Sequence, residues 1–83
     1  MEKKRDTVTY ELEQGGAVVY IGTTNDPERR KQQHRDDNKI FERMNITSNP
    51  MTEDEAKREE AKQLAVYRSR YGRNPKYNKD SDG

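Results

Sequence analysis

Hydrophobic and polar residues alternate strictly between Thr7 and Glu13, near the start of the chain. Val8, Tyr10 and Leu12 fall on one side of this segment, and threonine and glutamate residues fall on the other. Such alternation is typical of a half-buried β-strand. We therefore expect a strand with one buried face and a polar face that is wet or only thinly covered.

A second strand is predicted directly after the first. The apolar, β-branched run at residues 17–21 follows residues 14–16, which have the composition of a turn. Together the two segments predict an antiparallel hairpin. A three-residue loop would place Tyr10 opposite Tyr20, whereas a two-residue loop would separate the two tyrosines. We favour the three-residue loop, because it keeps apolar partners together.

A short helix and a third strand are predicted next. A polar cap at Thr24–Asp26, a proline at the first helical position and an acid in the first turn are typical of a helix start. We expect this helix to extend from Pro27 to about Arg35, with little hydrophobic burial because it is almost wholly polar. The segment Lys39–Thr47 contains four apolar residues and predicts a third strand, although its alternation is broken.

A long helix follows. Thr52 and Glu55 have the spacing of a capping box, and Gly72 is expected to end the helix after Tyr71. The order of elements is β-β-α-β-α. It predicts an α+β fold in which helices flank a small three-stranded antiparallel sheet.

The composition allows only a thin core. The chain has 83 residues, of which 27% are hydrophobic and 40% charged, and this excludes a second domain or a large enzyme core. Disorder is the alternative for so polar a chain, but the net charge is only +1 and the apolar residues are patterned. We expect one folded domain at residues 7–78, with a disordered segment at residues 1–6 and a frayed tail at residues 79–83.

Several classes of protein are excluded by what the chain lacks. It has no cysteine, so it can form neither a disulfide nor a thiolate metal site. Its longest apolar run is too short to cross a membrane, and no apolar signal-peptide region follows the charged start. We therefore expect a cytoplasmic protein with no membrane partner.

One carboxylate lies where an apolar residue is expected. The predicted inward face of the long helix consists of Ala56, Glu60, Leu64, Tyr67 and Tyr71. A carboxylate on such a face is costly unless it meets a cation, a hydrogen-bond cluster or a metal ion. Glu60 is thus a candidate metal ligand, and an ion pair with an arginine of the first helix is the alternative. Glu59 falls about 100° away, among polar positions.

Two further patterns point to phosphate chemistry. Arg30 and His34 are four residues apart and share a face of the first helix; an arginine suits phosphate contact and a histidine titrates near neutral pH. Two solvated polar residues would give the same pattern. Basic residues without an acid gather near the C-terminus, as on a phosphate-binding face or a solvated helix end. They include Arg68, Arg70, Arg73 and Lys76.

These features occur in an order that resembles the GIY-YIG nuclease domain. Tyr-Ile-Gly at residues 20–22 follows another tyrosine ten residues earlier, and Pro-Lys-Tyr-Asn at residues 75–78 is similar to the Pro-x-x-Asn that closes that domain. The first motif departs from the family, because Thr-Val-Thr-Tyr stands where Gly-Ile-Tyr is usual. Threonine also follows Tyr-Ile-Gly where repair-type members carry lysine. The matching residues span nearly the whole chain: Tyr10, Tyr20, Arg30, His34, Glu60 and Asn78.

The resemblance implies an endonuclease that uses Mg²⁺ or Mn²⁺ to hydrolyse DNA phosphodiester bonds with little sequence specificity. Glu60 would hold the metal ion, and Arg30 would bind the scissile phosphate. Tyr20 or Tyr10 would take a proton from the attacking water, and His34 would orient or relay that proton.

The remaining residues would support the site or bind DNA. Asn78 would brace the site, and the basic residues near the C-terminus would contact DNA phosphates. Two alternatives stay open from the sequence. One is a catalytically inactive nucleic-acid-binding module on the same scaffold, with a protein partner or larger complex for targeting. The other is a structural or protein-interaction domain.

Overall fold

The computed structural model describes residues 4–78 and has the predicted α+β fold. Its three strands form one antiparallel sheet in the order β2-β1-β3. Of the predicted unstructured ends, residues 1–3 and 79–83 lie outside the described residues. The order β-β-α-β-α is confirmed. The elements are β1 (Val8–Gln14), β2 (Ala17–Thr24), α1 (Pro27–Asp36), β3 (Arg43–Ile46) and α2 (Glu53–Tyr71).

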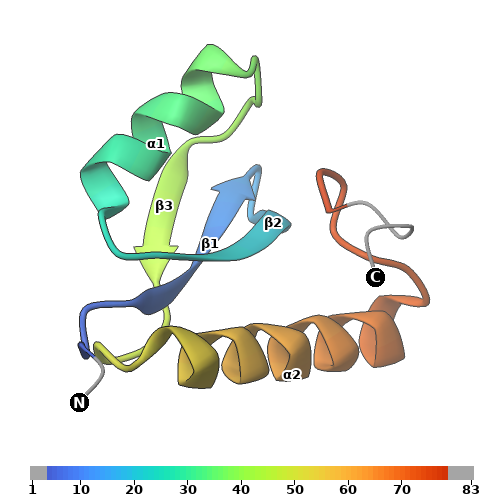
Figure 1. Cartoon of the computed structure of the whole chain (residues 1–83). Helices are drawn as coiled ribbons and strands as arrows, with labels where there is room; N and C mark the ends of the chain where they lie inside the picture. The colour runs from blue at the N-terminus through green and yellow to red at the C-terminus, as the bar shows by residue number, and fades with distance from the viewer. Residues whose placement is uncertain (1–3, 79–83) are drawn as a thin grey trace.

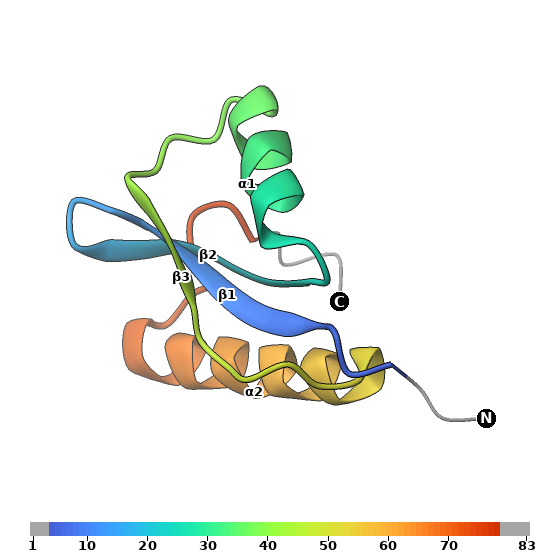
Figure 2. The same cartoon turned by 90° about the vertical axis from the view of Figure 1, so that its left-hand side faces the viewer.

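The two helices lie on opposite sides of the sheet, α1 above it and α2 below it in Figure 1, and the turned view of Figure 2 shows the same layers. Successive residues of a strand point to opposite faces. Accordingly, the Tyr10 hydroxyl contacts His34 of α1, whereas the Thr9 hydroxyl accepts a hydrogen bond from Gln63 of α2. The prediction of a wet or thinly covered polar face on β1 is wrong, because α2 covers it and Thr9 is fully buried.

A two-residue turn joins the first two strands. Gly15 and Gly16 both have positive φ, +59° and +80°, a conformation that glycine adopts without steric cost. The turn pairs Gln14 with Ala17. Turns with positive φ at both central residues match the twist of the strands they connect, so this turn outcompetes the three-residue loop that we predicted.

A β-bulge then moves the pairing by one residue. Val19 has no partner on β1, so Leu12 lies opposite Tyr20 and Tyr10 lies opposite Gly22. The predicted pairing of Tyr10 with Tyr20 is therefore wrong. The extra residue nevertheless returns both tyrosines to the α1 side of the sheet, where they lie diagonally across the two strands.

The main hydrophobic cluster lies on the α1 side and is as small as the composition predicts, and Ile21 and Ala56 are buried outside it. α1 itself buries one residue, His34. Within residues 4–78, no helix is long and apolar enough to span a membrane. The buried core residues and the half-buried ones packed on them are Tyr10, Leu12, Val19, Phe41, Tyr20, Met44 and Tyr77.

The helix α2 has the predicted ends but not quite the predicted face. Thr52 and Glu55 form the capping box, and Gly72 ends the helix in the left-handed conformation. Ala56 is fully buried, as expected. Tyr71, in contrast, is 58% exposed, so its assignment to the inward face is wrong. Its ring packs on Tyr67 at the side of a groove rather than in the core.

The C-terminal segment closes the outer edge of β2. The backbone N–H of Tyr77 donates to the carbonyl of Val19 at 2.8 Å. The side-chain amide of Asn78 bonds both backbone groups of Ile21: it accepts from the N–H at 2.9 Å and donates to the carbonyl at 3.0 Å. One side chain thus replaces the peptide group of a neighbouring strand and protects the edge.

Replacing Asn78 with alanine should lower the free energy of unfolding by about 1–3 kcal/mol, because both edge hydrogen bonds are lost. Urea denaturation followed by circular dichroism measures the change. Asn49→Ala, at an exposed position, is the control and should change it by less than about 0.5 kcal/mol. Equal stability of the two variants would contradict the bracing role of Asn78.

Candidate functional site

Two tyrosines and the only histidine of the chain meet on the α1 face of the sheet. The ring centroids of Tyr20 and His34 are 4.8 Å apart, those of Tyr10 and His34 5.7 Å, and those of the two tyrosines 5.9 Å. The Tyr10 hydroxyl lies 2.6 Å from Nε2 of His34. The structure therefore brings together three of the residues that the sequence predicted for the site.

Gly22 makes room for this cluster. A Cβ atom at this position would lie 2.7 Å from Cε2 of Tyr20 and 2.8 Å from the hydroxyl of Tyr10. Side chains do not tolerate contacts this short, so any other residue would push both rings away. The glycine of the Tyr-Ile-Gly motif thus has a steric role: it opens the surface of β2 on which the two rings converge.

His34 is uncharged at neutral pH. Burial and the nearby charges of Lys39 and Arg30 lower its pKa from 6.5 to about 4. Its Nδ1 atom is buried and has no hydrogen-bond partner within residues 4–78. An unpaired acceptor is less unusual than an unpaired N–H, so we assign the proton to Nε2, which then donates to the Tyr10 oxygen.

Tyr10 is held in its protonated form. Burial is the largest cause that raises its pKa well above the usual value of 10, and the neighbouring Tyr20 adds to this through charge and hydrogen bonding. A hydrogen bond that favours the protonated form is one in which Tyr10 donates. Together with the His34 tautomer, this defines a chain of donors that leads from His34 through Tyr10 to Tyr20.

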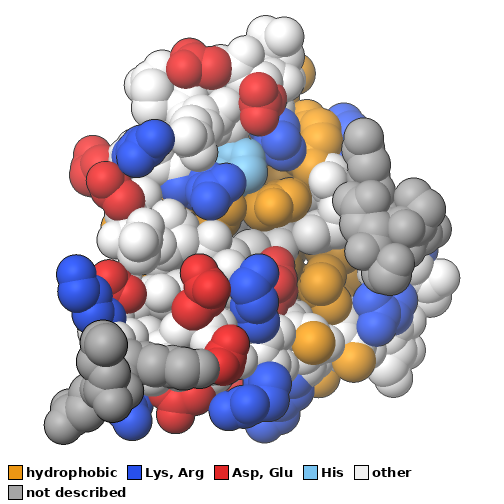
Figure 3. All heavy atoms as spheres, viewed as in Figure 1, with side chains coloured by type: hydrophobic (Ala, Val, Ile, Leu, Met, Phe, Trp, Pro, Cys, Tyr) orange, Lys and Arg blue, Asp and Glu red, His pale blue; other side chains and the backbone are white. Residues whose placement is uncertain are grey.

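Two cations flank the cluster. The charge of Arg30 affects the pKa of both Tyr10 and His34, and its side chain is exposed. Nζ of Lys39 lies 5.6 Å from the centre of the Tyr20 ring. Figure 3 shows the pale-blue histidine with Lys or Arg side chains on either side and hydrophobic side chains next to it. Lys39 also forms a salt bridge with Asp37 at 3.8 Å, so Arg30 is the cation of the pair that is available to an anion.

Glu60 lies on α2, across the sheet from α1. It is half-buried, and this burial raises its pKa. Its charge contributes to the raised pKa of Tyr10, so the carboxylate lies within electrostatic range of the cluster. Within residues 4–78 it forms no salt bridge, and the predicted alternative of an ion pair with an arginine of α1 is not formed.

The carboxylate of Glu60 would be a single metal ligand. No group of three histidine, aspartate or glutamate side chains that could hold a metal occurs in residues 4–78. Mg²⁺ usually keeps several water ligands and binds through one or two carboxylates. The nearby charge of Lys57 partly offsets the effect of burial on the pKa of this carboxylate, but Lys57 forms no salt bridge with it within residues 4–78. A partly desolvated carboxylate of this kind fits a hydrated ion, whereas it does not fit a metal that needs a full set of protein ligands.

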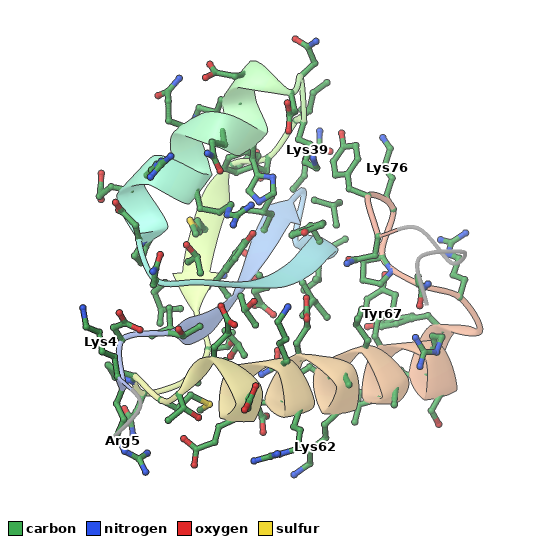
Figure 4. The ribbon with its side chains drawn as sticks, viewed as in Figure 1. Lys4, Arg5, Lys39, Lys62, Tyr67 and Lys76 are labelled. Carbon is green, nitrogen blue, oxygen red and sulfur yellow. The ribbon has the colours of Figure 1, made fainter. Side chains whose placement is uncertain are left out.

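The basic residues near the C-terminus do not form a single cluster. The Arg68 guanidinium donates to the side chain of Asn74, which braces the chain after α2. Nζ of Lys76 lies 5.4 Å from the Tyr77 ring, and Lys39 approaches the same ring at 6.0 Å. Figure 4 shows Lys39 and Lys76 at one end of the molecule although they come from different segments.

Arg70 and Arg73 lie elsewhere and line a groove beside α2. Lys76 is therefore the predicted phosphate-binding residue that is linked to the tyrosine cluster: it contacts the Tyr77 ring, and Lys39 lies over both Tyr77 and Tyr20.

One cation of the site, Lys39, was not predicted from the sequence. Lys39 was assigned to a strand, but the structure places it in the loop after α1, where Asn38 with φ of +66° turns the chain. Its backbone N–H donates to the carbonyl of His34 at 3.1 Å. No sequence pattern marks this residue, because it reaches Tyr20 through a turn that only the folded chain defines.

Acidification should destabilise the protein through His34. The folded-state pKa of about 4 lies below the unfolded value of 6.5, so this contribution is present above pH 6.5 and is lost as the pH falls towards 4. Between pH 7 and pH 4.5 the free energy of unfolding should fall by about 2 kcal/mol more than in His34→Gln. Urea denaturation at both pH values measures this. The same pH dependence in both proteins would contradict a neutral, buried histidine.

Comparison of the chain with known protein families, curated proteins and solved structures finds no match. The resemblance to the GIY-YIG domain therefore stays a prediction from the sequence. Any function has to be argued from the geometry of the tyrosine cluster and the charges around it.

Proposed function

We propose that this protein is a divalent-metal-dependent endonuclease that hydrolyses DNA phosphodiester bonds with little sequence preference, as the resemblance to the GIY-YIG domain implies. The observation that carries the proposal is the contact of Tyr10, Tyr20 and His34 on one sheet face. A fixed cation, Arg30, and a partly buried carboxylate, Glu60, lie within electrostatic range of Tyr10. A base, a cation and a metal ligand are the groups that phosphodiester hydrolysis needs.

Tyr20 is the proposed base. Tyr10 is unsuited to this role, because its raised pKa keeps it protonated and its hydroxyl is engaged with His34. Tyr20 is half-buried and lies next to the ammonium group of Lys39. The Tyr10 hydroxyl can donate to the Tyr20 oxygen, and such a bond is stronger when that oxygen carries negative charge. His34 and Tyr10 are thus positioning residues for the base.

Arg30 and Glu60 would act on the phosphate. The exposed guanidinium of Arg30 would bind the scissile group and stabilise the charge that develops on its oxygens. A divalent ion bound at Glu60 would stabilise the leaving oxygen and the non-bridging charge. Lys39 and Lys76, near the Tyr77 ring, would hold the adjacent backbone phosphates.

Glu60→Gln should abolish cleavage of supercoiled plasmid in Mg²⁺ or Mn²⁺, because the amide keeps the shape of the side chain but loses the charge that attracts the ion. Glu59→Gln is the matched control and should cleave normally, since Glu59 accepts a hydrogen bond from Gln63 on the side of α2 facing the groove. Gel electrophoresis of the nicked and linear products, with a chelator control, measures both.

Loss of activity in both variants, or only in Glu59→Gln, would show that Glu60 is not the metal ligand. Wild-type protein that retains DNA but never cuts it in either metal would identify a non-catalytic binding module.

Tyr20→Phe should lower the cleavage rate about 100-fold or more and remove the basic ionisation from the pH–rate profile, because it deletes the proposed base. Tyr10→Phe should lower the rate less than about 10-fold, while reducing stability by about 1–3 kcal/mol through the unpaired His34 nitrogen. Single-turnover cleavage at several pH values measures the rates. A larger loss of rate in Tyr10→Phe would assign the base to Tyr10.

A further inference from the structure

The proposed reaction does not use a groove on the α2 side of the sheet. This groove has a volume of about 550 Å³, which is in the range of small-ligand sites. It lies between α2 and the β1–β2 hairpin, which extends past the C-terminal end of α2 in Figure 2. The residues that form its walls near the hairpin are Val18, Ile21, Tyr67, Tyr71, Arg70 and Arg73.

Two tyrosines of α2, Tyr67 and Tyr71, form an aromatic pair at this groove. The rings of Tyr67 and Tyr71 have centroids 4.5 Å apart. The Tyr67 hydroxyl donates to the carbonyl of Val18 at 3.4 Å, which fixes this ring between α2 and β2, and Figure 4 shows Tyr67 directed from α2 towards the C-terminal segment. Tyr71 is 58% exposed. A rigid inner ring thus supports an outer ring with an accessible aromatic surface.

Two cations lie beside the aromatic pair. Within residues 4–78, neither Arg70 nor Arg73 forms a salt bridge. Glu59, which also lines the groove, precedes Arg70 by eleven residues, about 16 Å along a helix. Arg70 and Arg73 are thus well separated from Glu59, and an anion would bind beside them at the C-terminal end of α2, next to Tyr71.

The groove also continues towards the tyrosine cluster. A second hollow shares Val18, Tyr67 and Arg73 with it and follows the edge of β2 as far as Asn78. Asn78 bonds Ile21, the residue after Tyr20. A nucleic-acid strand in the groove could therefore continue along this hollow towards the C-terminal segment that covers the edge of β2.

We propose that this groove binds an unpaired nucleotide of a nucleic-acid strand, with the base stacked on Tyr71 and its phosphates held by Arg70 and Arg73. Exposed aromatic rings beside cations are the features that bind single strands without sequence preference. The inference rests on the proposed action on DNA. It adds a substrate class, because DNA with a single-stranded segment next to the cut would use both sites.

Binding in the absence of metal tests this inference without any cleavage. Fluorescence anisotropy with a chelator present would compare a labelled 20-nucleotide thymidine strand with an abasic strand of equal length and charge. Stacking on an aromatic side chain contributes about 1–3 kcal/mol per base. The wild-type protein should therefore bind the thymidine strand about 10-fold more tightly than the abasic strand.

Tyr71→Ala should remove this preference for bases, and Tyr71→Phe, which keeps the ring, should retain it. Because Tyr71 is largely exposed, both variants should fold, and thermal unfolding checks this. Equal binding of the two strands by the wild type, or an unchanged preference in Tyr71→Ala, would overturn the inference. Plasmid cleavage by the wild type bears on the proposed function alone, so the two proposals can fail separately.

Discussion

The close approach of two tyrosine rings and a histidine over Gly22 is the contact on which this small structure depends. A chain with 27% hydrophobic residues cannot fill one side of a sheet with aliphatic side chains alone. Large aromatic rings bury more surface per residue, but they need space at the sheet surface. The glycine provides this space, because a Cβ would meet both rings at less than 3 Å.

This arrangement makes the core and the candidate site the same group of residues. Tyr10 is both a fully buried core residue and a hydrogen-bond donor, and His34 attaches the otherwise polar α1 to the sheet. Burial keeps the histidine neutral and Tyr10 protonated. The hydrogen-bond donors of the cluster therefore lead from His34 through Tyr10 to the Tyr20 oxygen. Substitutions at the site will therefore affect stability as well as chemistry.

The other side of the sheet is held together differently. Thr9, fully buried, contacts Thr47 and Gln63 through hydrogen bonds, where most small domains would use aliphatic packing. Buried polar groups are stable when they are paired in this way. The apolar surface of α2 is instead shifted towards the C-terminal end, where Tyr71 is exposed in the same groove as Arg70.

The order of the elements and the ends of β1, α1 and α2 could be predicted from the sequence, because these depend on local chemistry, whereas the predicted third strand began four residues too early. The alternation before Gln14, the capping box at Thr52 and the glycine after Tyr71 all act within a few residues, and the α+β order follows from them. The sequence also predicted correctly that Tyr10 and Tyr20 share a face of the sheet, although the predicted strand register was wrong.

The contacts that those elements make depend on the tertiary structure. The bulge at Val19 and the cover that α2 provides over Thr9 depend on how the strands and helices fit together in space. The position of Lys39 next to the Tyr20 ring depends on the same fit, because a turn at Asn38, which has a positive φ, directs the chain there. Helical and strand periodicity describe one element at a time, so they carry no information on where a neighbouring segment will pack.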